Sequence, residues 1–371
     1  MRKRAIYVTR AAVLLWPVLV TGSFGQNHDG ATIGHEESFE CEKGLVFIKA
    51  AINQSRELDV VLDTGASVSV IAPSVVQKLK LKMLSAAEAA GPGRGSNTKL
   101  QIANGVAIET DGVKVENQSI AALSVDYIAV QAGHPTEGIL SVNAFANDAV
   151  DVDYETKRLR FLDSAKFAPS PGAVEVPLKI NDGVPLIQAQ VQTPRGETAT
   201  GTFVLDSGFT ATIIFSKPFL DLHPEFTRSI PKIDVPRISA VGGSMQMQLG
   251  RISSLQIGHF VFKEPIANFP VNPAGVLTNA KIAGIIGAGV LKRFHVVYDY
   301  LRSRVLLAPN TSFEDPFEAD MSGLRLVTDP PDFHRFIVRG ILANSPAALA
   351  GIRPGDVLVA VDDTPSTAHT L

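Results

Sequence analysis

One short motif occurs twice in this chain, and the repetition constrains the fold more than any other feature. Residues 60–65 read VVLDTG, and residues 203–208 read FVLDSG. In both places an apolar, β-branched run ends in an aspartate, a hydroxyl residue and a glycine. The apolar run predicts a buried strand, and the glycine permits a turn that needs either a positive φ or a close backbone approach.

Further landmarks follow each motif in the same order, which indicates a duplicated unit. Similar apolar elements begin at Gly138 and Gly284, and an Asp-Tyr pair follows each of them, at residues 153–154 and 299–300. We expect Asp153 and Asp299 to be structural, closing the turn before the last strand of each copy. The two copies are predicted to span residues 41–167 and 172–312, joined by a proline-rich linker at residues 168–172.

The two aspartates, Asp63 and Asp206, suit a specific chemistry if the copies pair. A carboxyl group at the end of a buried strand is costly unless it is paired, hydrogen-bonded or functional. Two carboxyl groups a few ångströms apart share one proton. The charged partner can then act as a general base on a water molecule while the protonated one polarises a carbonyl. Hydroxyl groups of Thr64 and Ser207 can hold the two loops in register.

Residues 62–67 and 205–210 resemble the active-site motifs of the aspartic proteases, and the elements at 138–141 and 285–287 resemble the strand beneath each active-site loop. The pattern is similar to the single-chain, two-lobed retropepsin-like or pepsin-like type. This resemblance implies a mostly β fold of two pseudo-symmetric β-barrel lobes with the active site between them. It also implies a catalytic dyad, a supporting loop and no metal or cofactor. The residues concerned are Asp63 and Asp206 for the dyad, and Thr64, Gly65, Ser207 and Gly208 for the loop.

The sequence departs from the family pattern in two respects. Ser141 stands where the second copy has Gly287, and the family usually has glycine there. The expected flaps, residues 91–95 and 239–244, are glycine-rich and carry no tyrosine. An aspartic endopeptidase acting on a peptide or protein substrate is therefore the leading interpretation. The alternative is a catalytically inactive, protease-like peptide-binding or scaffold protein.

Other chemistries find little support in the sequence. Residues 91–95 lack the Lys-Ser/Thr ending of a phosphate loop and follow residues 85–90, which we expect to be helical. The eight histidines form no close ligand set for zinc. A net charge of −3, with both signs interspersed, gives no electrostatic footprint for nucleic acid. The oligomeric state stays open.

The first 25 residues read as a signal peptide. Residues 2–4 are basic, residues 11–20 are apolar, and small residues at 23–25 precede Gln26. The apolar stretch is shorter than the roughly 20 residues needed to cross a bilayer, and Pro17 interrupts it, so cleavage is favoured over a membrane anchor. Residues 26–40 read as a polar leader. We therefore expect an exported, periplasmic or secreted protein with no stable membrane span after signal cleavage.

The C-terminal segment, residues 322–371, resembles part of a PDZ domain. The likeness is specific for the core at residues 344–358, with a short alanine-rich helix, a turn at 355–356 and a strand over 357–361. Residues 322–326 stand where such modules place their carboxylate-binding loop and the edge strand that pairs with a peptide. The second helix, which forms the other wall of the peptide groove, is missing from the segment. We expect a partial α+β module, either truncated or vestigial.

Overall fold

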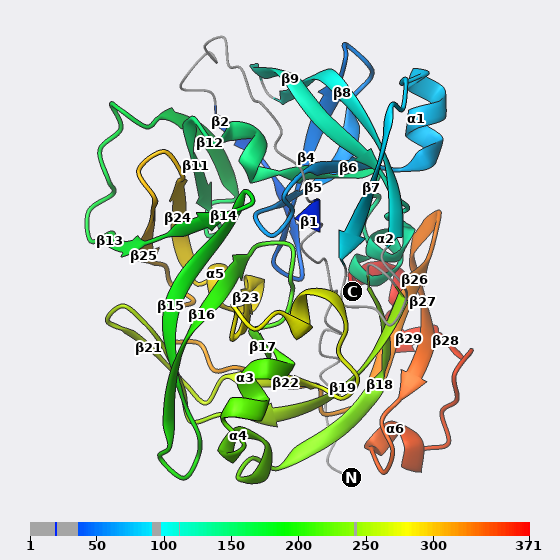
Figure 1. Ribbon diagram of the computed structural model, residues 1–371. Helices are drawn as coiled ribbons and strands as arrows, with labels where there is room; N and C mark the ends of the chain where they lie inside the picture. The colour runs from blue at the N-terminus through cyan, green and yellow to red at the C-terminus, as the bar shows by residue number, and fades with distance from the viewer. Residues whose placement is uncertain (1–18, 21–35, 91–97, 111, 241–242) are drawn as a thin grey trace.

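The computed structural model describes residues 19–20, 36–90, 98–110, 112–240 and 243–371. The chain is mostly β, with two lobes and a smaller C-terminal segment beside them (Figure 1). The predicted fold class, two pseudo-symmetric β lobes with a partial α+β module, is confirmed. Among these described residues, no helix has the length and apolar character to cross a membrane.

The first lobe contains a nine-stranded sheet in which β8 pairs with β4 as well as with β7 and β9, so the sheet folds back on itself. Its strands, in sheet order, are β1 (Leu19–Val20), β7 (Ser85–Ala90), β8 (Thr98–Thr110), β9 (Val113–Ala122), β6 (Ser69–Ile71), β10 (Gly138–Ser141), β5 (Leu58–Asp63), β4 (Leu45–Ile52) and β3 (Glu40–Glu42). The lobe also carries α1 (Pro73–Leu79), α2 (Asp126–Ala132) and the 3-10 turn η1 (Val142–Phe145).

The second lobe repeats this arrangement in a ten-stranded sheet. Its strands are β18 (Lys232–Ala240), β19 (Gly243–Arg251), β22 (Ile266–Pro270), β17 (Ile213–Phe215), β23 (Gly284–Gly287), β16 (Thr198–Asp206), β15 (Val184–Gln192), β20 (Ser254–Ile257) and β21 (Phe260–Lys263), with β14 (Lys179–Asn181) beside β15. The run β9-β6-β10-β5-β4 in the first lobe matches β22-β17-β23-β16-β15 here, with the same parallel and antiparallel pairings. The helical elements are α3 (Lys217–Leu222), α4 (Glu225–Arg228), η2 (Gly275–Thr278) and α5 (Ala288–Leu291).

A six-stranded sheet joins the two lobes, and the sequence did not predict it. Its order is β13 (Val174–Pro177), β25 (Arg304–Pro309), β24 (Phe294–Asp299), β11 (Asp148–Asp153), β12 (Arg158–Asp163) and β2 (Glu36–Ser38). The central antiparallel pair, β11 with β24, joins the final hairpin of the first copy, β11–β12, to that of the second, β24–β25. Each copy therefore contributes its final hairpin to one shared layer.

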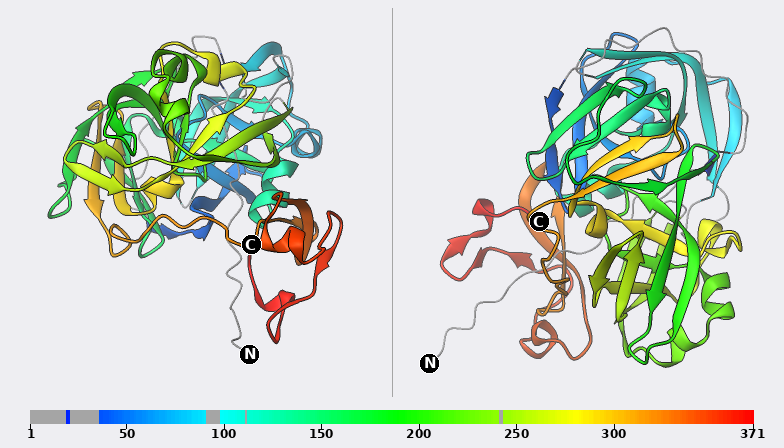
Figure 2. Two further views of the ribbon diagram at one scale, coloured as in Figure 1. Left: turned by 90° about the horizontal axis from the view of Figure 1, so that it is seen from below. Right: turned by 90° about the vertical axis from the view of Figure 1, so that its left-hand side faces the viewer.

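The C-terminal segment forms a small three-stranded sheet on one side of both lobes (Figure 2). It consists of β26 (Leu324–Asp329), β27 (Asp332–Ile341) and β28 (Val357–Leu358), followed by the pair β29 (Ala360–Val361) and β30 (Thr364–Pro365). The expected alanine-rich helix is α6 (Pro346–Leu349), capped by the Ser345 hydroxyl, and η3 (Ser366–Ala368) lies near the end. The strand expected over 357–361 is divided into β28 and β29.

Some predictions for short segments of the first lobe differ from the structure. Residues 85–90, expected to be helical, form strand β7 because they pair along their length with β8; this prediction was wrong. Strand β1 lies within the predicted signal peptide and pairs with β7, while β2 and the first residue of β3 lie within the predicted leader. The first expected flap, residues 91–95, lies outside the described residues.

Candidate active site

Each motif aspartate stands at the end of a buried strand, between apolar layers. Asp63 is the last residue of β5 and Asp206 the last residue of β16, and both side chains are fully buried. Strand β10 runs parallel to β5 and places Ser141 beside Asp63, while β23 places Gly287 beside Asp206. The strand beneath each loop was predicted from the sequence, and both lie as expected.

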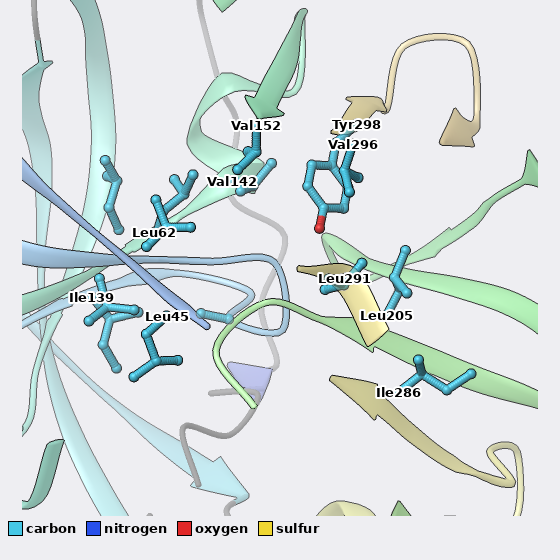
Figure 3. Close-up of a cluster of buried hydrophobic side chains, with 14 of the residues drawn as sticks. Leu45, Leu62, Ile139, Val142, Val152, Leu205, Ile286, Leu291, Val296 and Tyr298 are labelled. Atoms are coloured by element: carbon cyan, nitrogen blue, oxygen red, sulfur yellow. The ribbon is translucent and has the colours of Figure 1, made fainter. Parts of the chain in front are cut away.

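Apolar side chains of both lobes surround this junction. Figure 3 shows Leu62 and Ile139 on one side, with Leu205 and Ile286 on the other. The exposed fraction of each is 1% or less. Burial of this kind excludes water from the ends of the strands, so any polar group there depends on partners within the protein.

Thr64 and Ser207 bind the two loops to each other by a symmetric set of hydrogen bonds. The Thr64 hydroxyl donates to the Leu205 carbonyl at 2.7 Å and accepts from the Ser207 amide at 2.9 Å. The Ser207 hydroxyl donates to the Leu62 carbonyl at 3.0 Å and accepts from the Thr64 amide at 3.0 Å. Each hydroxyl thus donates one hydrogen bond to the opposite loop and accepts one from it. These four bonds fix the relative position of the two aspartates.

The glycines after these hydroxyls are required by close approach rather than by a positive φ. Neither Gly65 nor Gly208 adopts a left-handed backbone conformation. A Cβ atom on Gly65 would lie 2.5 Å from Cγ of Asp206, and one on Gly208 would lie 2.5 Å from Cγ of Asp63. Each aspartate therefore packs on the glycine of the opposite loop, so the two carboxyl groups lie next to each other across the seam.

The surroundings of the two carboxyl groups favour a shared proton. Burial raises the pKa of Asp63 from 3.8 to about 6, opposed by hydrogen bonds from its neighbours. Burial and the charge of Asp63 raise the pKa of Asp206 well above its ordinary value. Two like charges in a buried site cannot both be stable, so one group stays protonated.

Backbone amides hold the inner oxygen of each aspartate. Oδ1 of Asp63 accepts hydrogen bonds from Gly65 N at 2.7 Å and Ala66 N at 3.1 Å. Oδ1 of Asp206 accepts from Gly208 N at 2.8 Å. The outer oxygens, Oδ2 of both aspartates, are buried and receive no hydrogen bond from a described residue. Two such acceptors side by side can hold a polar molecule between them.

The departure from the family pattern at Ser141 has a structural reason. The Ser141 hydroxyl donates to the Ala66 carbonyl at 2.6 Å, and its amide donates to the Ser69 hydroxyl at 3.1 Å, so this residue supports the Asp63 loop directly. In the second lobe the backbone comes closer, and a Cβ on Gly287 would lie 2.1 Å from the Phe209 carbonyl oxygen. One lobe supports its loop with a hydroxyl and the other by direct backbone packing.

Two tyrosines near the carboxyl pair were not identified from the sequence. The hydroxyl of Tyr127, on α2, is buried and has no hydrogen-bond partner among the described residues. Burial and the charges of Asp63 and Asp206 raise the pKa of its phenol. Burial and the charge of Asp206 likewise raise the pKa of Tyr298, on β24, which directs its hydroxyl toward the seam (Figure 3). No local motif marks Tyr127, because only the packing of α2 brings it to the site.

The Asp-Tyr landmarks are structural, as predicted. Oδ1 of Asp153 accepts from the amides of Glu155 and Thr156, which closes the turn before β12. Oδ1 of Asp299 accepts from the Arg302 amide before β25.

Of the second expected flap, residues 239–240 end β18 and residues 243–244 begin β19, with Ser239 paired to Ser244, while residues 241–242 lie outside the described residues. In the first lobe, β7 and β8 flank the other expected flap. Within the described ranges, no group of three or more His, Cys, Asp or Glu side chains is arranged to hold a metal ion.

Comparison with known proteins identifies the same two classes that the sequence resembled. The aspartyl protease family model matches residues 48–144, and the PDZ domain model matches residues 337–371. Both resemblances are thus confirmed as family matches, the first covering the loop of Asp63 and the strand β10. No curated protein matches the sequence.

Among solved structures, the chain is similar to the crystal structure of the aspartic proteinase from Irpex lacteus. The sequence identity is 14% and the TM-score 0.44, and the alignment covers 76% of this chain and 99% of that chain.

Proposed function

We propose that this protein is an aspartic endopeptidase that hydrolyses peptide bonds with the pair Asp63 and Asp206. The observation that supports this most is the meeting of two fully buried carboxyl groups, each packed on the glycine of the opposite loop. Apolar residues at these two positions would stabilise the fold more than a buried acid pair does, so the pair is better explained by function than by stability.

The two carboxyl groups take different roles in the reaction because they share one proton. Whichever carboxyl group of the pair is ionised accepts a proton from a bound water molecule, and the water oxygen attacks the carbonyl carbon of the scissile bond. The protonated partner gives its proton to the carbonyl oxygen, so the tetrahedral intermediate is neutral and this partner becomes the ionised one. The C–N bond then breaks: the carboxyl group that took the water proton passes it to the leaving amine, and the other carboxylate takes back a hydroxyl proton as the carbonyl re-forms. The Thr64 and Ser207 hydroxyl bonds keep both carboxyl groups in place throughout.

The test is a peptide-library digest of the mature protein from acidic to neutral pH, with Asp63→Asn and Asp206→Asn as variants. Both variants are expected to lose cleavage by a factor of about 10³ or more while keeping the fold. Thr278→Val, an exposed site on η2 whose hydroxyl bonds only the local Gly275 carbonyl, is the control. Cleavage retained by either Asn variant would reject the proposal. Peptide binding without cleavage by the wild type would favour the inactive, peptide-binding alternative.

We also propose that the protein is exported, with cleavage of the signal peptide before Gln26. The support is the order of basic, apolar and small residues in positions 1–25. N-terminal sequencing of the protein recovered from its host compartment tests this, and an intact Met1 terminus on the exported protein would contradict it.

A further inference from the structure

Helix α2 joins the candidate active site to the C-terminal segment. At one end it carries Tyr127, which packs on a buried cluster that contains Val204 and Phe209, the residues on either side of the Asp206 motif, and whose hydroxyl is buried. At the other end, Gly133 adopts a left-handed conformation with φ of 75° and caps the helix. The helix has only seven residues and no side-chain cap at its N-terminus. Because such short helices are marginal by themselves, contacts from outside decide how firmly α2 is held.

Strand β26 of the C-terminal segment supplies those contacts. The Thr328 hydroxyl donates toward the carbonyls of Ala129 at 3.3 Å and Val130 at 3.1 Å, which lie in the last turn of α2. These are carbonyls that a helix end leaves without intrahelical partners or only partly satisfied. The methyl group of Thr328 also packs against Gly133, where an added Cβ would lie 3.3 Å from it.

A buried guanidinium forms the second contact. Nη2 of Arg325 donates to Oε1 of Gln131 at 3.1 Å, and the exposed fraction of Arg325 is 8%. The Gln131 side chain in turn donates from Nε2 to the Tyr127 carbonyl at 3.1 Å. A continuous series of hydrogen bonds therefore leads from β26 to the backbone of Tyr127. Burial lowers the pKa of Arg325 to about 10, so this guanidinium is costly to bury and its partner on α2 offsets part of that cost.

The position of β26 also bears on the resemblance to a PDZ domain. β26 is an edge strand of its small sheet, and it includes part of the region, residues 322–326, that the resemblance assigns to peptide pairing. In the structure α2 of the first lobe lies beside this strand (Figure 1). On the second lobe, Gly340 of β27 packs on Pro236 of β18, where an added Cβ would lie 2.7 Å from the Pro236 Cβ.

We propose that the C-terminal segment is an intramolecular clamp on the active site: its strand β26 binds the chain's own helix α2 and so holds the Tyr127 hydroxyl beside the Asp63–Asp206 pair. Arg325 and Thr328 are positioning residues, since they act through α2. Tyr127 is the residue of α2 through which the segment is expected to act on the pair. The docking of β26 on α2 stands independently of the proposed peptidase activity, whereas the effect on catalysis rests on it.

The test uses the full chain with the double variant Arg325→Met and Thr328→Val, which removes both polar contacts and keeps the side-chain volume. The matched control is Arg353→Met with Thr364→Val, since both residues are exposed on the same segment and lie outside β26. Hydrogen exchange of the amides in residues 126–132 is the first measurement. We expect exchange about tenfold faster or more in the double variant and unchanged in the control. Equal exchange in wild type and double variant would overturn the clamp, whether or not the protein cleaves peptides.

The second measurement is kcat/KM for the double variant with and without Tyr127→Phe. If the segment acts through Tyr127, the double variant lowers kcat/KM about tenfold, and this loss disappears in the Tyr127→Phe background. An equal loss in both backgrounds would show that the segment does not act through Tyr127. If the wild type cleaves no peptide, the proposed function is wrong. The hydrogen-exchange measurement then still tests whether β26 holds α2.

Discussion

Asp206 is placed where ionisation is opposed both by burial and by a second carboxyl group. A group whose pKa is raised on folding binds more protons in the folded state than in the unfolded state. Its contribution to the free energy of unfolding is therefore lost as pH rises from its ordinary pKa to its folded pKa. For Asp63, a rise from 3.8 to about 6 corresponds to a loss of about 3 kcal/mol over that window. Asp206 extends the loss to higher pH.

Asp206→Asn is therefore expected to stabilise the protein at neutral pH while abolishing cleavage. The amide keeps the shape of the side chain, and it removes the repulsion that ionisation of the pair produces. We expect the free energy of unfolding to rise by about 1 kcal/mol or more at about pH 7.5, and to change little at about pH 3.5, where both carboxyl groups of the wild type are protonated. Urea unfolding at the two pH values measures this. A variant destabilised equally at both would contradict the raised pKa of the pair.

At the scale of single elements, the two motif loops depend on each other through Thr64 and Ser207. Removing either hydroxyl leaves a buried amide of the opposite loop without its acceptor. Such an unsatisfied group costs about 1–3 kcal/mol. Thr64→Val and Ser207→Ala are each expected to lower the free energy of unfolding by about that amount, and the double variant by less than the sum.

Chemical denaturation of the two single variants and the double variant gives this comparison. Thr227→Val removes an exposed hydroxyl bonded only to the Pro224 carbonyl, and serves as the control. Strict additivity of the two changes would mean that the loops are held independently of each other.

The sequence predicted these loops well because their chemistry is local and repeated. The apolar runs, the hydroxyls and the glycines occur within a few residues of each aspartate, and the duplicated order reveals which strands lie beneath them. The helix predicted over residues 85–90 was wrong for the opposite reason. An alanine-rich run favours a helix, but pairing with β8 makes it a strand. Tyr127 and the six-stranded sheet likewise depend on contacts between distant segments, which no short window of sequence contains.

For the whole molecule, the seam between the lobes includes a charged contact that responds to pH. Nε2 of His295, on β24, bonds Oδ1 of Asp151, on β11, and Arg160 also bonds Asp151. The bond to Asp151 raises the pKa of His295, with burial opposing it and the charges of Asp153 and Arg160 acting in opposite directions. A raised histidine pKa adds stability that is fully present below the ordinary value of 6.5 and lost as pH rises through the folded value.

Asp151→Asn is therefore expected to destabilise the protein more at about pH 5.5 than at about pH 9, because the charged pair exists only at the lower value. Guanidinium unfolding of wild type and variant at both pH values isolates the difference, since the other titrating groups are common to the two proteins. His295→Gln, measured at the same two pH values, should show the same pH-dependent loss in the free energy of unfolding while it keeps the contact between Arg160 and Asp151. A destabilisation by Asp151→Asn that is the same at both pH values would exclude an ionic contribution from His295.

The layer built from β11 and β24 has a consequence for synthesis. A ribosome delivers β11 long before β24, so during translation the first copy carries an unpaired strand edge along residues 148–153. Expressed alone, the first copy would present that edge to its neighbours, and self-association through it is the natural result. The six-stranded sheet can therefore form only after residues 294–299 are synthesised, when β24 pairs with the exposed edge of β11.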